Sequence, residues 1–233
     1  MIFRQLFDEE SCTYTYLIGS EYSKHAVLID PVLNHVGRYI ALINKYQLHL
    51  VASIDSHLHA DHITASGSLT ETTRCISMMG RETKAEHIRM KFKDQDELKF
   101  GDLKLKAIYT PGHTDDSYCF LMNKALFTGD TLFIGGTGRT DFQNGSASQQ
   151  YDSLFNGILK LPEHTLVYPG HDYKGNKVST IGKELKTNPR LQVKSKEEYI
   201  HMMENLNLAP PKRIHVALPA NLKNGLVGAE TYI

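Results

Sequence analysis

The sequence predicts an α/β fold in which two β-sheets pack together and are covered by helices. Short β-rich runs open the chain, an αβ stretch follows, and a second β-rich stretch precedes a final αβα order. Two turn signals, Gly101-Asp102 and Asn123-Lys124, are each flanked by apolar runs, which is typical of β-hairpins. A chain of 233 residues can bury a sizeable core as one domain.

The first part of the chain supplies four predicted strands and two predicted helices. The helix after the third strand is indicated by Val36, Tyr39, Ile40 and Ile43, which share one face at helical spacing. In chain order, the predicted elements are strands Met1–Leu6, Thr13–Ile18 and Ala26–Ile29, helix Val36–Tyr46, strand Leu48–Ile54 and helix Thr64–Thr72.

The second part supplies the two hairpins, then three helices with a strand between the first two. In chain order, these elements are strands Leu98–Phe100, Leu103–Tyr109, Tyr118–Met122 and Ala125–Phe127, helix Gln149–Leu161, strand Leu166–Tyr168, and helices Ile181–Lys186 and Lys196–Glu204. We expect one domain over residues 1–233, with a C-terminal extension from about residue 190 packed on it.

Composition argues against several classes of function. Basic and acidic residues balance at 26 each, so bulk attraction to nucleic acid or an acidic membrane is not expected. No apolar run reaches the roughly 20 residues that a membrane span needs. The three cysteines are widely spaced, which disfavours a disulfide scaffold or a cysteine-only zinc site. The N-terminus lacks the layout of a signal peptide, so a reducing, cytoplasmic location is the expectation.

Seven potential metal ligands lie just beyond predicted strands. They are His57, His59, Asp61, His62, His113, Asp130 and His171. The first four stand within six residues, and crowded ionisable groups are costly to desolvate unless a cation compensates them. Imidazole and carboxylate groups suit zinc, iron or manganese, whereas Ca²⁺ requires mostly oxygen ligands. The sequence therefore predicts a metal site.

Each candidate has a structural alternative when it is taken alone. His113 or His171 would be an ordinary structural histidine, and Asp130 an Asx-turn residue. Asp61 would be a helix cap ahead of the next predicted helix. The conjunction of seven such residues at strand ends favours the metal site, because strand ends that converge at one sheet edge form a natural active site.

Four of these segments, in this order, resemble the metallo-β-lactamase superfamily. They are His-x-His-x-Asp-His at 57–62, Gly-His-Thr at 112–114, Thr-Gly-Asp at 128–130 and Gly-His at 170–171. The resemblance implies an αββα sandwich of two mixed β-sheets flanked by helices, with the metal at the edge where the sheets meet.

Superfamily analogy alone implies a dinuclear hydrolase, and glyoxalase II is the hydrolase that residues 129–136 resemble. One metal would be held by His57, His59 and His113. The other would be held by Asp61, His62 and His171, and Asp130 would bridge the two. Such a site would hydrolyse a thioester such as S-lactoylglutathione.

Other segments resemble the persulfide dioxygenases more closely, from end to end of the chain. They comprise residues 2–7, 11–17, 138–143, 169–173, 178–180, 188–190, 205–208 and 216–222. The resemblance implies one non-haem Fe(II) per chain, held by His57, His113 and Asp130 as a two-histidine, one-carboxylate set with open positions. It further implies that glutathione persulfide is oxidised with O₂ to sulfite and glutathione. A homodimer is compatible with it, since dimers are common in the family.

The same resemblance assigns roles to seven further residues. Orienting roles, through hydrogen bonds and without a second metal, fall to His59, Asp61, His62 and His171. Carrier-binding roles fall to Arg139, Tyr173 and Arg190. Arginine can hold a carboxylate through paired hydrogen bonds. Taken alone, either arginine would be a surface ion-pair residue and the tyrosine a packing residue.

The chain departs from the family pattern at three positions. Many members carry cysteine where Thr137 and Asn224 stand, and arginine where Gly135 stands. Thiol-based regulation at these positions is therefore not expected. The predicted iron chemistry needs no protein thiol, so the main interpretation is unaffected.

Overall fold

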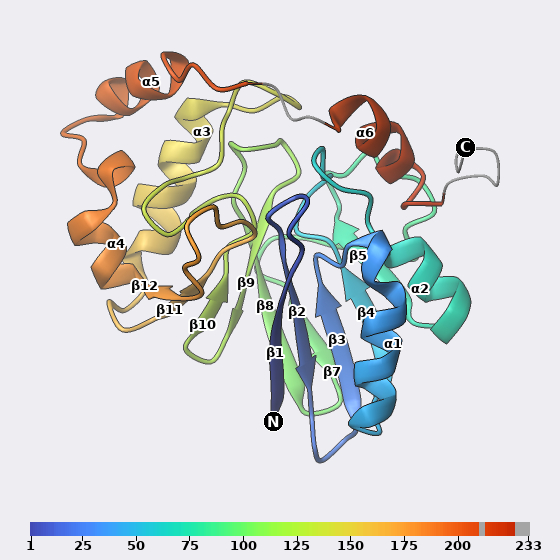
Figure 1. Cartoon of the computed structure of the whole chain (residues 1–233). Helices are drawn as coiled ribbons and strands as arrows, with labels where there is room; N and C mark the ends of the chain where they lie inside the picture. The colour runs from blue at the N-terminus through green and yellow to red at the C-terminus, as the bar shows by residue number, and fades with distance from the viewer. Residues whose placement is uncertain (210–212, 227–233) are drawn as a thin grey trace. The chain divides into compact units, whose positions relative to one another are not determined.

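The computed structural model describes residues 1–209 and 213–226 (Figure 1). The backbone forms two compact units. The first comprises Met1–Phe92, Lys99–Lys104 and the described residues after Ala209, and the second comprises Lys93–Leu98 and Leu105–Ala209. Within the described residues, no helix is both long and apolar enough to cross a membrane.

The first sheet has six strands in the order β1-β2-β3-β4-β5-β6. Neighbours are antiparallel from β1 to β3 and parallel from β3 to β6. The strands are β1 Ile2–Phe7, β2 Tyr14–Gly19, β3 His25–Ile29, β4 His49–Ile54, β5 Ile76–Gly80 and β6 Met90–Phe92. Since β3 and β4 are parallel, the residues after them, Asp30 and Asp55, come to the same edge of the sheet.

The second sheet also has six strands, in the order β12-β11-β10-β9-β8-β7. The strands are β7 Glu97–Phe100, β8 Leu103–Tyr109, β9 Tyr118–Met122, β10 Ala125–Phe127, β11 Leu166–Tyr168 and β12 Ser179–Thr180. Strands β10 and β11 are parallel, whereas β9 is antiparallel to both β8 and β10. The loops that follow β8, β10 and β11 carry the predicted ligands of the second unit, His113, Asp130 and His171.

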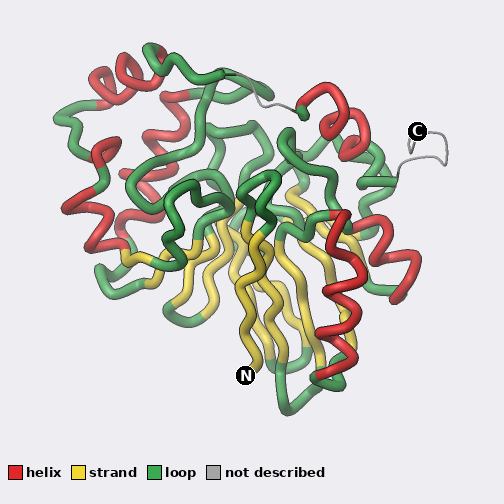
Figure 2. The backbone as a smooth tube through the Cα atoms, in the orientation of Figure 1, coloured by secondary structure: helices red, strands yellow, loops and turns green. Residues whose placement is uncertain are grey.

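Within the described residues, six α-helices accompany these sheets, and Figure 2 colours helices, strands and loops differently. They are α1 Val36–Lys45, α2 Ser66–Thr73, α3 Ala147–Tyr151, α4 Ile181–Thr187, α5 Lys196–Glu204 and α6 Ile214–Leu222. In the first unit, Tyr39 and Ile43 of α1 share a buried cluster with Leu28 of β3. In the second unit, Tyr199 of α5 shares one with Val167 of β11.

Most predicted elements are confirmed, with ends within a residue or two. The predicted helix Gln149–Leu161 is wrong in detail: α3 is followed by a π-helical segment, Asp152–Gly157, and a 3₁₀ turn, Ile158–Lys160. Gly157 leaves the helical backbone region with φ −114° and ψ −104°, which accounts for the break. The single-domain description with an extension from about residue 190 stays a prediction.

Among the described strands and α-helices, four were not expected: β5, β6, β12 and α6. Strand β12 has only two residues, too short for a periodic pattern. Helix α6 contains Pro219, which removes a helical N–H donor and disfavours a helix. It forms nonetheless in the segment that the sequence marks as a family signature.

Two glycines, each the second residue of a helix, predict opposite effects on stability. A Cβ at Gly67 would lie 2.4 Å from the carbonyl oxygen of Asn224, whereas at Gly37 nothing lies within 4 Å. Gly67→Ala should lower the free energy of unfolding by about 1–3 kcal/mol. Gly37→Ala should raise it by about 0.5–1 kcal/mol, because alanine loses less backbone entropy in a helix. Urea unfolding followed by circular dichroism checks both, and equal effects would contradict the close approach at Gly67.

Candidate metal centre

The predicted site residues fall into two groups, one in each unit. The loop between β4 and α2 in the first unit carries His57, His59, Asp61 and His62. The second unit carries His113, Asp130, His171, Arg139, Tyr173 and Arg190.

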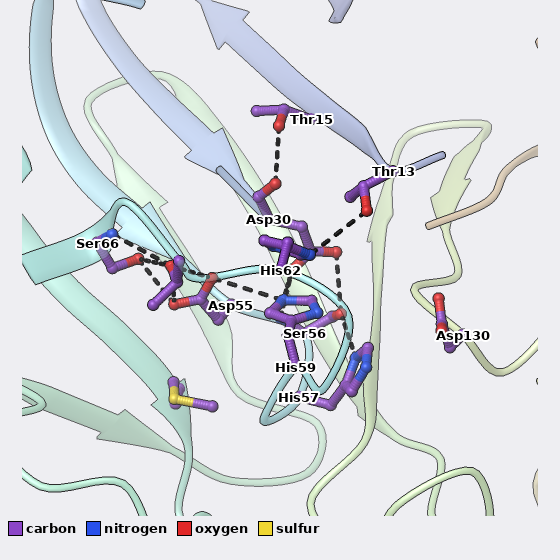
Figure 3. A network of polar contacts seen from close by, with 12 residues as sticks. Thr13, Thr15, Asp30, Asp55, Ser56, His57, His59, His62, Ser66 and Asp130 are labelled. Carbon is purple, nitrogen blue, oxygen red and sulfur yellow. Dashed lines mark hydrogen bonds and ion pairs between the residues drawn. The ribbon is translucent and has the colours of Figure 1, made fainter. Parts of the chain in front are cut away.

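His57 is oriented by a buried chain of hydrogen bonds that starts at Asp30 (Figure 3). The Asp30 carboxylate accepts from the Ser56 backbone N–H at 2.6 Å and from the Ser56 hydroxyl at 2.9 Å. Because that hydroxyl has one proton, its contact with His57 Nδ1, at 2.9 Å, has the imidazole as donor. His57 is therefore held with its proton on Nδ1, which leaves Nε2 as the coordinating nitrogen.

Asp30 is itself fixed by its backbone. Its carbonyl accepts a hydrogen bond from the Thr15 hydroxyl at 2.8 Å. The Thr15 hydroxyl in turn accepts from the Tyr39 hydroxyl, which accepts from the Val32 N–H. Burial raises the pKa of Tyr39 to about 12, so this hydroxyl stays protonated. Asp30 adopts φ +51°, a left-handed conformation that is uncommon for residues other than glycine and often marks a functional site.

His59 lies between two buried carboxylates. Its Nε2 is 3.3 Å from Asp30 Oδ1 and 3.6 Å from Asp55 Oδ1, as in an ion pair, and it makes no regular hydrogen bond among the described residues. Burial disfavours the charged imidazole, but the interactions with Asp30 and Asp55 outweigh burial and raise the pKa of His59 well above its usual value. The Asp55 carboxylate also accepts from the hydroxyls of Thr64 and Ser66, at 2.8 and 2.7 Å.

Asp61 and His62 form a second pair on the same loop. Asp61 Oδ2 accepts from His62 Nδ1 at 2.9 Å and from the Thr13 hydroxyl at 3.0 Å. His62 Nε2 is buried and has no hydrogen-bond partner among the described residues. One ligand atom from each of His59, Asp61 and His62 lies within 4.8 Å of the others, which is close enough to share a metal ion.

The end of the loop is held by a residue that the sequence did not single out. Asn221 of α6 donates from Nδ2 to the carbonyls of His59 and His62, at 2.9 and 2.8 Å. Its Oδ1 accepts from the Thr64 N–H at 2.9 Å. The amide thus binds the loop backbone at three points.

In the second unit, His113 is oriented by a carbonyl. Its Nδ1 lies 2.7 Å from the carbonyl oxygen of Arg139, which can only accept, so the proton again resides on Nδ1. His113 Nε2 is 3.5 Å from Asp130 Oδ2. A lone pair and a carboxylate oxygen that face each other at this distance repel unless a cation lies between them.

Asp130 uses its other oxygen to bind His171. His171 Nδ1 lies 2.7 Å from Asp130 Oδ1, so the imidazole orients the carboxylate. Gly138 and Gly170 lie so close to Asp130 that neither position has room for a Cβ atom. A Cβ at Gly138 would lie 2.1 Å from the Asp130 carbonyl oxygen, and one at Gly170 would lie 2.6 Å from Asp130 Oδ1.

The donor set fits a transition metal. His57 and His113 have their protons fixed on Nδ1, and Asp130 turns one oxygen towards His113 Nε2. Nitrogen and carboxylate donors of this kind suit iron, zinc or manganese. The chain therefore has candidate ligands for such a metal in both units, as the sequence predicts.

The predicted carrier-binding residues differ in their surroundings. Arg139 binds Asp141 through two hydrogen bonds, at 2.6 and 2.7 Å, and also binds the carbonyls of Leu208 and Ala209. These contacts hold the loop that contains the carbonyl partner of His113. Contact between Arg139 and a substrate stays a prediction.

The surroundings of Arg190 and Tyr173 differ from those of Arg139. Arg190 is half-buried and contacts Thr137 and the sulfur of Met203, but it pairs with no carboxylate among the described residues. Burial lowers its pKa from the usual value. Tyr173 is 70% exposed, and its ring stacks on that of His171 with centroids 6.0 Å apart.

Three orienting residues were missed by the sequence analysis: Asp30, Ser56 and Asn221. Asp30 directly follows a predicted apolar strand, as the predicted ligands do, so its position was a usable signal. Ser56 precedes His57 but carries no pattern of its own. Asn221 lies 162 residues beyond His59, and nothing local connects the two.

The chain is similar to known proteins over much of its length. Residues 86–171 match the family model of the metallo-beta-lactamase superfamily. The chain is 43% identical, over 97% of its length and 89% of the relative, to the mitochondrial persulfide dioxygenase ETHE1 of Mus musculus. A hydroxyacylglutathione hydrolase of Dictyostelium discoideum is 37% identical over 69% of the chain and 62% of the relative.

A solved structure extends the similarity to the fold. The crystal structure of ETHE1 from Myxococcus xanthus matches 97% of this chain and 100% of its own, with 52% identity and a TM-score of 0.94. This match, together with two mixed six-stranded sheets, confirms the predicted αββα fold of the metallo-β-lactamase type. The chain therefore belongs to the persulfide dioxygenase family of the metallo-β-lactamase superfamily.

Proposed function

We propose that this protein is an iron-dependent oxidoreductase that oxidises glutathione persulfide with O₂, giving sulfite and glutathione. The observation that carries the proposal is the 43% identity to a persulfide dioxygenase over 97% of the chain. The relative named as a glutathione thioester hydrolase is similar over a smaller share of the chain.

We assign one Fe(II) to His57, His113 and Asp130. The assignment is supported by the two fixed Nδ1 protons and by the Asp130 oxygen turned towards His113 Nε2. Iron held by two histidines and one carboxylate keeps positions open for a sulfur ligand and O₂, and so supplies the oxidation. The described contacts of His171 and of Ser56 with these side chains support orienting roles.

We assign binding of the glutathione carrier to Arg190. Its half-buried guanidinium has no carboxylate partner among the described residues, so a glutathione carboxylate would supply the missing charge. Tyr173, exposed and stacked on His171, would contact the carrier near the metal. Arg139, bound to Asp141, would act chiefly by holding its loop.

A dinuclear thioesterase is the second candidate, and a specific observation favours it. His62 Nε2 and His59 Nδ1 are buried without a hydrogen-bond partner among the described residues, and Asp61 stands beside them. These atoms are the donors that a second metal would use. The number and kind of bound metals therefore separate the two functions.

Protein purified without added metal should contain about one iron per chain, as expected for a single two-histidine, one-carboxylate site. It should consume O₂ with glutathione persulfide and leave S-lactoylglutathione intact. Metal analysis, an oxygen electrode and a thioester assay on one sample check this. Two zinc ions per chain with thioester hydrolysis and no oxygen uptake would reject the proposal.

Asp130→Ala should abolish both iron binding and oxygen uptake, since it removes the carboxylate ligand and frees His171. Asp152→Ala is the matched control, because it removes an exposed carboxylate that pairs with Lys196. Iron content after dialysis and oxygen uptake are the measurements. Retention of iron in the Asp130 variant would remove this residue from the ligand set.

Arg190→Ala should raise the KM for glutathione persulfide by about 10- to 100-fold, as a lost charged hydrogen bond costs about 1.5–3 kcal/mol. Arg190→Lys should recover part of this loss, because it keeps the charge but not the paired donors. The iron content should not change in either variant. Steady-state oxygen uptake measures KM and kcat, and an unaltered KM in the alanine variant excludes the assigned role.

A further inference from the structure

We infer that Asn221, in α6, is a positioning residue for the ligand loop 57–62, a role that rests on the function proposed above. The described hydrogen bonds of the Asn221 side chain all involve backbone groups: the carbonyls of His59 and His62 in the loop, and the N–H of Thr64 just after it.

Each polar group of the Asn221 amide has a partner in these contacts. Its two N–H groups donate to the carbonyls of His59 and His62, and its oxygen accepts from the Thr64 N–H. The side chain is 2% exposed, so water does not substitute for these bonds. The two carbonyls flank Asp61, so the amide fixes the second half of the loop.

No other side chain of this size reproduces the pattern. Aspartate offers no donor when it is ionised, and its oxygens would face two carbonyl oxygens. Glutamine has the same amide but is longer by one methylene, which a packed site does not absorb without strain. Removal of the amide would leave two carbonyls and one N–H buried without partners.

Helix α6 gives Asn221 a firm base within the first unit. The Leu222 carbonyl accepts from the Glu86 N–H at 2.7 Å, and the Asn224 carbonyl accepts from the Gly67 N–H at 3.0 Å. Leu222 also packs on a buried cluster that includes Leu58. Since Leu58 belongs to the ligand loop, α6 contacts this loop through both polar and apolar groups.

Two hydrogen-bonded supports therefore act on the loop from opposite ends. Ser56 and Asp30 orient His57 at its start, and Asn221 closes its end. If the second support is lost, the loop can relax into other conformations, and His59 then shifts against Asp30. Because Asp30 orients His57 through Ser56, the direction of the His57 ring changes as well. The expected result is a weaker and differently shaped metal site in a folded protein.

The test compares Asn221→Asp with Asn224→Gly. Asn224 is buried in the same segment, but its Nδ2 binds the His87 carbonyl, and glycine accepts its φ of +58°. Each protein is titrated with Co(II), whose visible absorption reports ligand geometry, and with Fe(II) against a competing chelator. Circular dichroism establishes that each is folded, and oxygen uptake gives kcat and KM.

Asn221→Asp should lower the affinity for both metals by about 10- to 100-fold, as loss of an orienting partner does. It should also shift the Co(II) absorption and lower kcat, with KM for glutathione persulfide unchanged. Asn224→Gly should leave the affinity and the absorption as in the unaltered protein.

Wild-type affinity and absorption in a folded Asn221→Asp protein would overturn the inference, and so would equal effects from Asn224→Gly. If Asn221→Asp does not fold, Asn221→Ser, which keeps one donor, decides by the same two measurements. Because the Co(II) comparison does not depend on the reaction, a failure of the proposed function appears separately, as absence of oxygen uptake in the unaltered protein.

Discussion

A fixed proton on Nδ1 of each proposed histidine ligand is the constraint on which the centre depends. In His57 the proton is fixed by the Ser56 hydroxyl, which is already committed to Asp30, and in His113 it is fixed by the Arg139 carbonyl. A neutral imidazole with one nitrogen occupied in this way has its remaining lone pair aimed in advance. Neither histidine therefore has to change its tautomer when a metal arrives.

The sheets supply the groups that impose this constraint. Parallel pairing of β3 with β4 brings Asp30 and Asp55 to one edge of the sheet. There each carboxylate accepts hydrogen bonds from hydroxyl or N–H donors. Such carboxylates remain buried because every strong acceptor has a partner. Asp30 also holds a left-handed backbone that the surrounding hydrogen bonds support.

Sequence reasoning predicts the regular elements well, and for physical reasons. Helix α1 has a clear apolar face, and the predicted ligands follow strands and stand beside glycines that admit close approach. It fails for α6, where Pro219 masks the helix, and for Asn221, whose partners are backbone atoms far away in the chain. Backbone carbonyls are present at every residue, so a side chain that binds them leaves no complementary residue to recognise.

The discontinuity of the first unit has a consequence for biosynthesis. Its ligand loop is synthesised before the second unit, but the amide that closes this loop belongs to a residue 162 positions later than His59. The intervening chain contains the whole of the second unit. The loop can therefore reach its fully supported conformation only after the second unit and helix α6 have been synthesised.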